Sequence, residues 1–311
     1  MSNPTKFTED AYEQTLIALF RDELGYEYEC GYDVERDPRE PYHREVLRAS
    51  IARLNPTLPT EAQEEIMKQV TQLADGNMLA DNERFMEMLQ GGVTVAVKTE
   101  LGGLKPKANP KSVKTGYFTE QENEQPHSFA ADAQMSWTRH VKAQLIDFEH
   151  PSHNDFRVVN QWRVEEFQNK RCDMVVMVNG LPLVVIELKS AIAENADIHD
   201  AYLQIRNYQQ AVPSLFAYNA FNVISDMSET RAGTITAKES RYMEWKTEDG
   251  RYETTQVADF RTFFRGIFQQ ERLLDILQNF ICFDKSQGSI SKVIQRLRVC
   301  DRHTRTRSLW P

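Results

Sequence analysis

The chain has 311 residues, of which 41% are hydrophobic and 27% are charged, and its formal net charge is −9. This length allows one large domain or two smaller ones, and the composition is that of an ordinary globular protein. No stretch approaches the roughly 18 uninterrupted apolar residues that a membrane helix needs, and the start MSNPTKFTED lacks the basic and apolar regions of a signal peptide. We therefore expect a cytoplasmic protein without a membrane partner.

Cysteine and histidine usage argues against a zinc site and against a disulfide framework. The cysteines lie far apart and form no C-x-x-C pair. His150 and His153 lie in a Pro/Asn-rich stretch, where a solvated turn is a better interpretation than a metal site. The four cysteines are Cys30, Cys172, Cys282 and Cys300.

The negative net charge does not predict a nucleic-acid-binding protein, but affinity for DNA depends on local basic surface rather than on the total. Two segments are locally basic, the loop at 104–115 and the run at 292–307. A solvated charged face is the default explanation for either segment. Their basic residues include Lys105, Lys107, Lys111 and Lys114 in the loop, and Lys292, Arg296, Arg298, Arg302, Arg305 and Arg307 in the run.

The first third of the chain predicts helices. Residues 7–24 should form one, with Thr8 as the N-cap, because apolar residues such as Tyr12 and Leu16 recur at helical spacing. After Gly92 the pattern changes to that of strands. Further helices are expected near 42–54, 60–74 and 79–90, and strands at 93–98, 141–148 and 156–164.

The stretch 174–189 is the most informative part of the chain. Two apolar runs, MVVMV and LVVIEL, flank an Asn-Gly pair, which is a strong hairpin signal. Both runs are apolar at nearly every position, so both faces should be covered, as in a central strand. A helix at 196–211, two or three strands within 215–236 and a helical segment at 259–297 follow. We expect an α/β fold: a mixed central sheet flanked by helices, with an N-terminal helical part and a C-terminal helical extension.

Asp173, Glu187 and Lys189 are the candidate catalytic residues, because they interrupt this apolar hairpin. Side chains alternate along a strand, so Glu187 and Lys189 share one face. A two-residue turn would pair Asp173 with Ile186 and place it on the opposite face from Glu187. A three-residue loop with Gly180 at positive φ would instead set Asp173 opposite Glu187. We predict the three-residue loop, because a cation can then bridge the two carboxylates.

The chemistry of these three groups suits a magnesium site. Opposed Cβ atoms lie about 4.5–5.5 Å apart, so two carboxylates placed there repel each other unless a cation binds between them. Carboxylate and carbonyl oxygens are the ligands of Mg²⁺, for which we expect Mn²⁺ to substitute. Lys189 could orient or deprotonate the attacking water and offset the charge of the transition state. The alternative is a purely structural ion-pair cluster, which the placement on an apolar hairpin makes the weaker interpretation.

Three further residues are candidates for supporting roles. Glu13 falls in the middle of the apolar stripe of the first helix, between Leu16 and Phe20, where a lone buried carboxylate needs a partner or a role. It would support the metal directly or through water, or it is a side chain that reaches solvent near the helix start. Gln204 and Tyr208 are spaced i, i+4, so they stand on one helix face and can contact phosphate.

These positions resemble the PD-(D/E)xK nuclease superfamily, in the branch that carries a Q-x-x-x-Y motif. The matching residues are Asp173, then Glu187-x-Lys189, then Gln204-x-x-x-Tyr208. The stretches LIDFEHPSHNDFRVVNQWRV, NKRCDMVVMVNGLPLVVIELKSA and LFAYNAFNVISD resemble the N-terminal nuclease domain of the restriction subunit of type I restriction–modification enzymes. This resemblance extends over most of residues 7–275.

The resemblance implies a mixed sheet of four or five strands, Mg²⁺-dependent cleavage of foreign double-stranded DNA, and partnership with modification (methyltransferase) and specificity subunits. The specificity subunit would set the recognition sequence. The implied roles are Asp173 and Glu187 as metal ligands, Lys189 as the catalytic lysine, and Gln204 and Tyr208 as the accessory motif. Glu13 matches, more loosely, an acidic residue often found on the first helix of such folds.

The sequence departs from that family in two respects. Cys172 stands where the motif usually has proline, which should affect entry into the strand rather than the chemistry. No G-x-x-x-x-G-K-[ST] phosphate loop occurs, so ATP would be needed only by motor lobes that this sequence does not show. The final RLRVCDRHTRTRSLWP does not resemble what normally follows in the family. We therefore expect a fragment, a truncation or an altered reading frame. Its nuclease domain would be 1–260, followed at 261–311 by a helical linker whose tail is a candidate for disorder.

Three functional hypotheses follow. The first is a catalytically competent endonuclease domain, in which loss of Lys189 or Asp173 abolishes cleavage. The second is a non-catalytic DNA-binding or docking module that cuts only within the full restriction complex. The third, a repair or RNA-processing nuclease of the same fold, would share the site and differ only in substrate, and the length of the family match argues against it.

Overall fold

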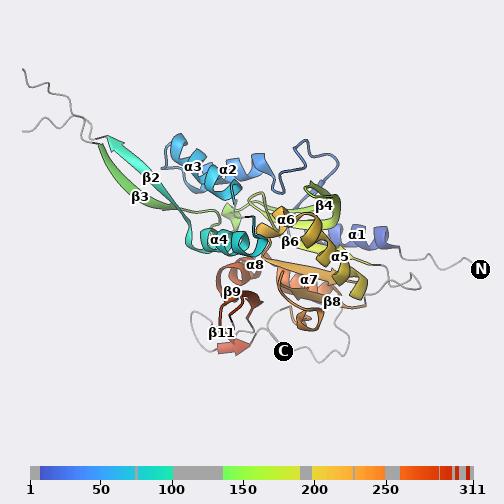
Figure 1. Cartoon of the computed structure of the whole chain (residues 1–311). Helices are drawn as coiled ribbons and strands as arrows, with labels where there is room; N and C mark the ends of the chain where they lie inside the picture. The colour runs from blue at the N-terminus through green and yellow to red at the C-terminus, as the bar shows by residue number, and fades with distance from the viewer. Residues whose placement is uncertain are drawn as a thin grey trace, which may run out of the picture.

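A mixed six-stranded sheet forms the centre of the fold (Figure 1). The structure is a computed structural model that describes residues 8–73, 76–100, 136–189, 198–226, 228–248, 260–286, 288–295, 298–300 and 306–308. The strands of the sheet are β1 (Glu27–Cys30), β4 (Phe156–Glu165), β5 (Asn169–Val178), β6 (Leu181–Leu188), β7 (Phe221–Ser225) and β8 (Thr230–Gly233).

The strand order is β1-β4-β5-β6-β7-β8, so β5 and β6, which carry the candidate catalytic residues, lie in the middle. The pairs β1/β4 and β6/β7 are parallel, and the other neighbours are antiparallel. Within the described residues this is more than the expected four or five strands. The α/β class and the mixed central sheet are confirmed.

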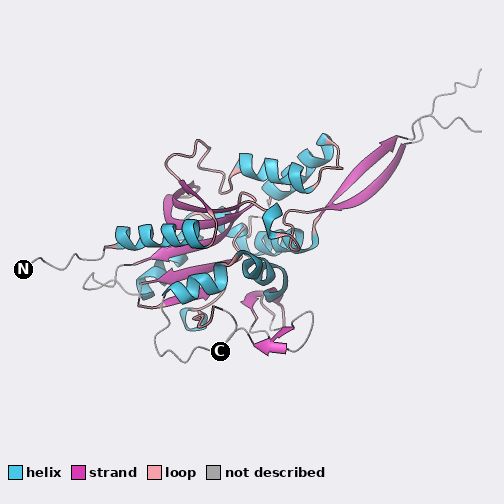
Figure 2. Cartoon of the chain, turned by 180° about the vertical axis from the view of Figure 1, so that it is seen from behind, coloured by secondary structure: helices cyan, strands magenta, loops and turns pink. Residues whose placement is uncertain are grey.

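Helices cover both faces of this sheet (Figures 1 and 2). A larger apolar cluster joins one face to helices from both ends of the chain, and a smaller cluster joins the other face mainly to α5 and α6. The helices on the larger cluster are α1 (Glu9–Ala18), η1 (Leu19–Glu23), α2 (Arg44–Leu54), α3 (Thr60–Thr71), α4 (Met78–Gly91), α7 (Phe260–Phe268), α8 (Gln270–Asp275) and η4 (Ile276–Phe280), and those on the smaller one are α5 (Ile198–Ala211) and α6 (Pro213–Ala217).

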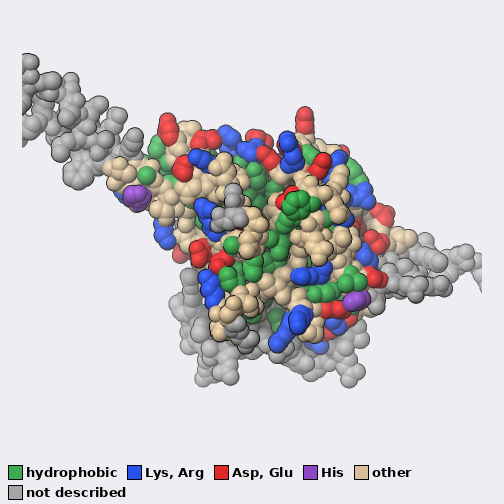
Figure 3. Space-filling model, in the orientation of Figure 1, with side chains coloured by type: hydrophobic (Ala, Val, Ile, Leu, Met, Phe, Trp, Pro, Cys, Tyr) green, Lys and Arg blue, Asp and Glu red, His purple; other side chains and the backbone are tan. Residues whose placement is uncertain are grey.

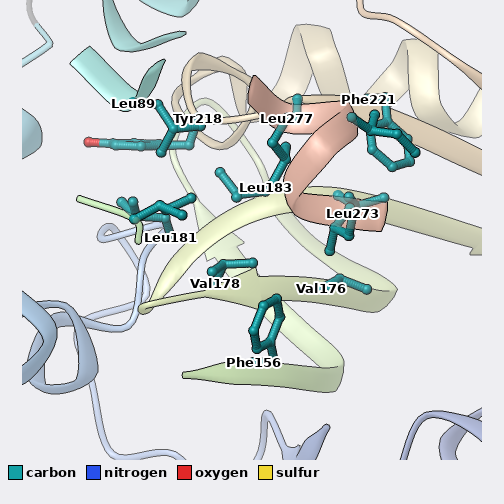
Figure 4. Close-up of a cluster of buried hydrophobic side chains, with 14 of the residues drawn as sticks. Leu89, Phe156, Val176, Val178, Leu181, Leu183, Tyr218, Phe221, Leu273 and Leu277 are labelled. Atoms are coloured by element: carbon teal, nitrogen blue, oxygen red, sulfur yellow. The ribbon is translucent and has the colours of Figure 1, made fainter. Parts of the chain in front are cut away.

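Helices from the two ends of the chain share one core. Figure 4 shows Val176 and Leu183 of the sheet packed with Leu89 of α4, Leu273 of α8 and Leu277 of η4. All five side chains are essentially buried. The C-terminal helices are therefore part of the same packed layer as the N-terminal ones. None of the helices in the described ranges combines the length and the apolar character needed to cross a bilayer.

The predicted helix starts agree well with the structure. Thr8 caps α1, and its side-chain oxygen accepts a hydrogen bond from the backbone N–H of Ala11 at 3.2 Å. The helix expected at 7–24 changes to a π-helical turn, η1, from Leu19 onward. The expected segments near 42–54, 60–74, 79–90 and 196–211 correspond to α2, α3, α4 and α5.

One predicted strand and one predicted helical segment end earlier in the structure than the sequence suggested. The strand predicted at 141–148 ends at Ala143, as β3 (Ser136–Ala143), which pairs with β2 (Val93–Glu100) in a ribbon that projects from the body (Figures 1 and 2). The helical segment predicted at 259–297 ends at Phe280, and β9 (Ile281–Asp284) and β10 (Ser291–Ile294) then form an antiparallel pair. Short remaining elements are η2 (Pro151–His153), η3 (Glu239–Arg241), β11 (Arg298–Cys300) and β12 (Thr306–Ser308).

The turn of the central hairpin has two residues, so the predicted three-residue loop was wrong. Val178 pairs with Leu181, and Asn179 and Gly180 have φ values of 53° and 78°. Both angles are positive, as in the turn type that Asn-Gly favours. The turn packs against α2: the carbonyl of Gly180 accepts a hydrogen bond from the His43 backbone N–H at 2.8 Å.

A β-bulge nevertheless produces the register that the longer loop was meant to give. Val176 pairs with Val184 but Met177 pairs with Pro182, so Leu183 is an extra residue in β6. Beyond the bulge Met174 pairs with Ile186, and the same register sets Asp173 opposite Glu187. The predicted register of Asp173 and Glu187 is therefore present, through a different backbone device.

Candidate active site

Asp173 and Glu187 are brought together by the neighbouring strands β5 and β6. The Asp173 carboxylate oxygen Oδ2 accepts a hydrogen bond from the backbone N–H of Leu188 at 2.9 Å, which ties the two strands together at this height. Lys189 follows β6 directly, and its backbone N–H donates to the carbonyl of Ser225 at the end of β7, at 2.8 Å. Three adjacent strands thus hold the predicted catalytic trio.

Glu187 is buried without enough hydrogen-bond donors. Its side chain is 2% exposed, and Oε1 accepts a hydrogen bond from the Lys189 ammonium at 2.6 Å. The other oxygen, Oε2, has no hydrogen-bond partner among the described residues. Burial, and next the charge of Asp173, raise the pKa of Glu187 to about 8 despite the nearby ammonium. A buried carboxylate with an unused oxygen is costly unless a cation or a proton satisfies it.

Asp173 shows the same deficit of positive charge. Burial raises its pKa to about 6, and the charges of Glu9 and Glu13 add to the rise, while the hydrogen bond from Leu188 and the charge of Lys189 oppose it. Within the described part of the site, one ammonium therefore has to compensate several carboxylates.

Lys189 remains protonated in this setting. Burial lowers its pKa, but the charge and hydrogen bond of Glu187 outweigh that effect, and the net pKa is raised. Its ammonium also donates to the Leu188 carbonyl at 2.9 Å. A cationic Lys189 can orient a water molecule or a phosphate oxygen and stabilise negative charge, whereas it cannot accept a proton.

Glu13 is buried, as the helical pattern predicted, and two amide side chains hold it. Its Oε1 accepts a hydrogen bond from Asn160 Nδ2 at 2.7 Å, and its Oε2 accepts one from Gln161 Nε2 at 2.8 Å. Helix α1 is itself tied to the sheet by a 2.7 Å hydrogen bond between the hydroxyls of Tyr12 and Ser225. Sequence reasoning missed both amides. The signal was available, since an Asn-Gln pair interrupts an apolar strand.

Tyr208 reaches the site from α5, on the opposite face of the sheet from α1. Its hydroxyl donates to the carbonyl of Arg171 at 2.8 Å. Burial and then the negative charge of Glu187 raise its pKa, which places the phenol in the electrostatic environment of the site. Gln204, one turn earlier on α5, opposes that rise by hydrogen bonding to Tyr208. The accessory pair is thus adjacent to the trio, with Tyr208 more deeply buried than Gln204.

The two basic segments contribute no described DNA-binding surface. The loop at 104–115 lies outside the described residues. In the C-terminal run Lys292 is 2% exposed, and its ammonium donates to the Asn82 side chain at 2.8 Å and to the Asn219 carbonyl at 2.5 Å, so its assignment to a basic surface was wrong. Figure 3 shows Lys and Arg interspersed with Asp and Glu over the face seen there, without a large patch of one sign.

His150 and His153 form a hydrogen-bonded turn with Asp147. The carboxylate Oδ1 accepts the backbone N–H groups of Glu149 and His150, both at 2.9 Å, and Oδ2 lies 3.3 and 2.8 Å from the Nδ1 atoms of His150 and His153. These three side chains could offer ligand atoms within 4.8 Å of one another. Both imidazoles are more than half exposed, and hydrogen bonds to Asp147 account for the arrangement. The turn that the sequence favoured is present.

Comparison with known proteins places the chain in a family. It matches the family described as "Type I restriction enzyme R protein N terminus" over residues 6–110 and 107–241, which is more than half of its length, and it belongs to that family. It is 29% identical over 293 residues to the type I restriction enzyme HindI endonuclease subunit of Haemophilus influenzae, covering 88% of this chain and 24% of the relative.

Other relatives agree. A protein of Methanocaldococcus jannaschii is 28% identical over 309 residues, covering 91% of this chain and 26% of the relative. The type I restriction enzyme EcoprrI endonuclease subunit of Escherichia coli is 33% identical over 152 residues, covering 46% of each. The chain therefore spans about a quarter of the length of the relatives that it matches most extensively. The expected family is confirmed.

Proposed function

We propose that this chain provides the magnesium-dependent endonuclease site of a type I restriction enzyme, which hydrolyses phosphodiester bonds of foreign double-stranded DNA. Asp173 and Glu187 would hold Mg²⁺, for which Mn²⁺ would substitute, and Lys189 would act beside them. DNA and the modification and specificity subunits are the proposed partners. ATP would serve only motor lobes, which lie outside this sequence.

The observation that carries the proposal is the buried, unpartnered oxygen of Glu187. Its Oε2 has no hydrogen-bond donor within the described ranges, and Asp173 lies opposite on the next strand. The ammonium of Lys189 forms an ion pair with Glu187, and no described residue forms one with Asp173. Two buried carboxylates with a shared deficit of positive charge fit a divalent cation, whose preferred ligands are oxygens.

Other residues of the site would position the water and the DNA backbone. Lys189, in its protonated form, would orient the attacking water and offset the charge that develops on the phosphate. Tyr208 and Gln204, on the α5 face, would contact the phosphate backbone and position it. When bound, the metal would supply Lewis-acid stabilisation and lower the pKa of a water molecule.

Nicking of supercoiled plasmid in the presence of Mg²⁺ or Mn²⁺ tests the proposal. Lys189→Ala and Asp173→Asn should lose cleavage while keeping the circular dichroism spectrum of the wild type. Lys68→Ala is the matched control, because Lys68 is an exposed lysine on α3 outside the site. Cleavage that persists in Lys189→Ala contradicts the proposal.

The docking alternative makes a different prediction for the same experiment. The chain spans about a quarter of its longest-matching relatives, so cleavage could need parts that lie outside it. In that case calorimetry would detect Mn²⁺ binding, but the wild-type chain would not nick plasmid. Absence of Mn²⁺ binding would contradict the metal site itself.

A further inference from the structure

Gln161 has an unusual backbone conformation for a residue inside a strand. Its φ of 53° lies in the left-handed region, which disfavours residues with a Cβ. The other non-glycine residue with positive φ in the described part of the chain is Asn179, in a hairpin turn where this conformation is ordinary. Strained conformations persist only where the surroundings enforce them, and they cluster at functional sites.

The strained residue lies opposite Asp173 at a point where strand β5 changes face. The ladder between β4 and β5 is regular on either side, but Gln161 and Asp173 are skipped. Met174 belongs to the larger apolar cluster and Cys172 to the smaller one, although residues two apart on a regular strand share a face. Asp173 therefore sits at the boundary between the two layers, where its charge is felt by Tyr208 of α5 and its own pKa is raised by Glu9 and Glu13 of α1.

The side chain of Gln161 is hydrogen-bonded to Glu13, whose charge affects Asp173. With Asn160 it donates to the Glu13 carboxylate, so that both oxygens of this buried group are fixed. The charge of Glu13 contributes to the raised pKa of Asp173, so the two carboxylates are within electrostatic reach. The backbone of Gln161 thus lies opposite Asp173, and its side chain is hydrogen-bonded to Glu13.

A glycine in the neighbouring loop accommodates this segment. A Cβ on Gly31 would lie 2.7 Å from the carbonyl oxygen of Gln161 and 2.8 Å from that of Asn160. The Gly31 N–H donates to the Asn160 carbonyl at 2.9 Å. The loop after β1 can approach the carbonyls of Asn160 and Gln161 this closely only because residue 31 is a glycine.

We propose that Gln161 is a positioning residue of the candidate nuclease site. Its left-handed backbone places Asp173 between the two layers, and its amide orients the Glu13 carboxylate toward Asp173. The inference rests on the proposed function, because metal binding is what this arrangement serves. Loss of the amide should weaken metal binding through Glu13, whereas relief of the strained backbone should stabilise the fold.

Two substitutions separate the two effects. Gln161→Ala removes the amide and keeps the strain, whereas Gln161→Gly removes both. Both variants should bind Mn²⁺ about tenfold more weakly than the wild type in calorimetric titrations, as is typical of residues that support metal ligands. Gln161→Gly should melt about 2–4 °C above Gln161→Ala, since glycine adopts positive φ freely.

A Glu13→Ala background shows whether the effect passes through Glu13. There, Gln161→Ala should change Mn²⁺ affinity less than twofold, because the group that it orients is gone; an undiminished effect overturns the proposal. Equal Mn²⁺ affinity in wild type and Gln161→Ala overturns the positioning role alone. A wild-type chain that binds no Mn²⁺ overturns the proposed function and the positioning role together. If Gln161→Gly is less stable than Gln161→Ala, the claim that the backbone at residue 161 is strained is overturned.

Discussion

Metal affinity should depend steeply on pH, because the metal-free site holds a proton at neutral pH. Burial raises the pKa of Glu187 to about 8 and that of Asp173 to about 6. At pH 7 roughly nine-tenths of Glu187 and about one-tenth of Asp173 are then protonated, treating the coupled pair as two separate groups. Since a divalent cation requires both carboxylates ionised, binding at pH 7 should release about one proton per ion.

The size of the effect follows from the fraction of sites with both groups ionised. Apparent Mn²⁺ affinity should fall about tenfold from pH 9 to pH 7 and roughly a further 15-fold from pH 7 to pH 6. Calorimetric titration in two buffers of different ionisation enthalpy measures the affinity and counts the protons released. A change of less than twofold between pH 7 and pH 9, without proton release, would refute the reasoning.

Glu187→Gln is the matched control, and it also predicts a change in stability. Without the Glu187 carboxyl, the remaining pH dependence should follow Asp173 and level off above pH 7. The pKa of Glu187 is raised from its ordinary value of 4.5, so metal-free stability is lost as pH rises from about 4.5 to about 8. Glu187→Gln should therefore lose less stability than the wild type over that range, in urea unfolding followed by circular dichroism.

Three further predictions concern other residues. Lys189→Ala should reduce plasmid nicking about 100-fold or more, because it removes the cation beside Glu187. Gly180→Ala should lower the free energy of unfolding by ~1–2 kcal/mol for its positive φ, and by a further ~1–3 kcal/mol because the new Cβ meets backbone atoms of α2 at 2.6 Å. Gly76 also has a positive φ, but a Cβ there would meet nothing within 4 Å, so Gly76→Ala should lose only the part due to φ. Equal losses of unfolding free energy for the two variants in urea titrations would contradict a contribution from the Cβ contact at Gly180. Burial lowers the pKa of Lys292, so the free energy of unfolding should rise more for the wild type than for Lys292→Met as pH rises from 7 toward 10. Equal increases in the two proteins would contradict a lowered pKa of Lys292.

Much of the fold could be read from local pattern. Helical spacing and capping by Thr8 predicted α1, and the Asn-Gly pair between apolar runs predicted the β5–β6 hairpin. The errors fell where local pattern is ambiguous. The short apolar runs after Phe280 form strands rather than a helix, and the strand predicted to reach 148 ends at Ala143. Short apolar segments suit either state, and packing decides between them.

The candidate site divides in the same way. Asp173, Glu187 and Lys189 stood out because polar groups on apolar elements need partners, a property visible in the sequence, and Tyr208 stood out through its i, i+4 spacing from Gln204. Asn160 and Gln161 also interrupt an apolar strand, but the group that they bond to could not be identified from the sequence, because Glu13 lies 147 and 148 positions away on another element. Catalytic roles and metal binding for all of these residues remain predictions.

The sequence by itself determined which groups are available and which elements carry them: two carboxylates and a lysine on an apolar hairpin, with a buried glutamate on the first helix. The tertiary structure alone decided that Asp173 and Glu187 lie opposite each other on neighbouring strands. A two-residue turn would place Asp173 and Glu187 on opposite faces, and the extra residue Leu183 restores their apposition. The turn fits against α2, whereas Glu187 shares the face of Val185, which packs in the smaller cluster with α5, and the bulge lies between the two. These constraints come from elements distant in the chain, so no local pattern could have placed the bulge.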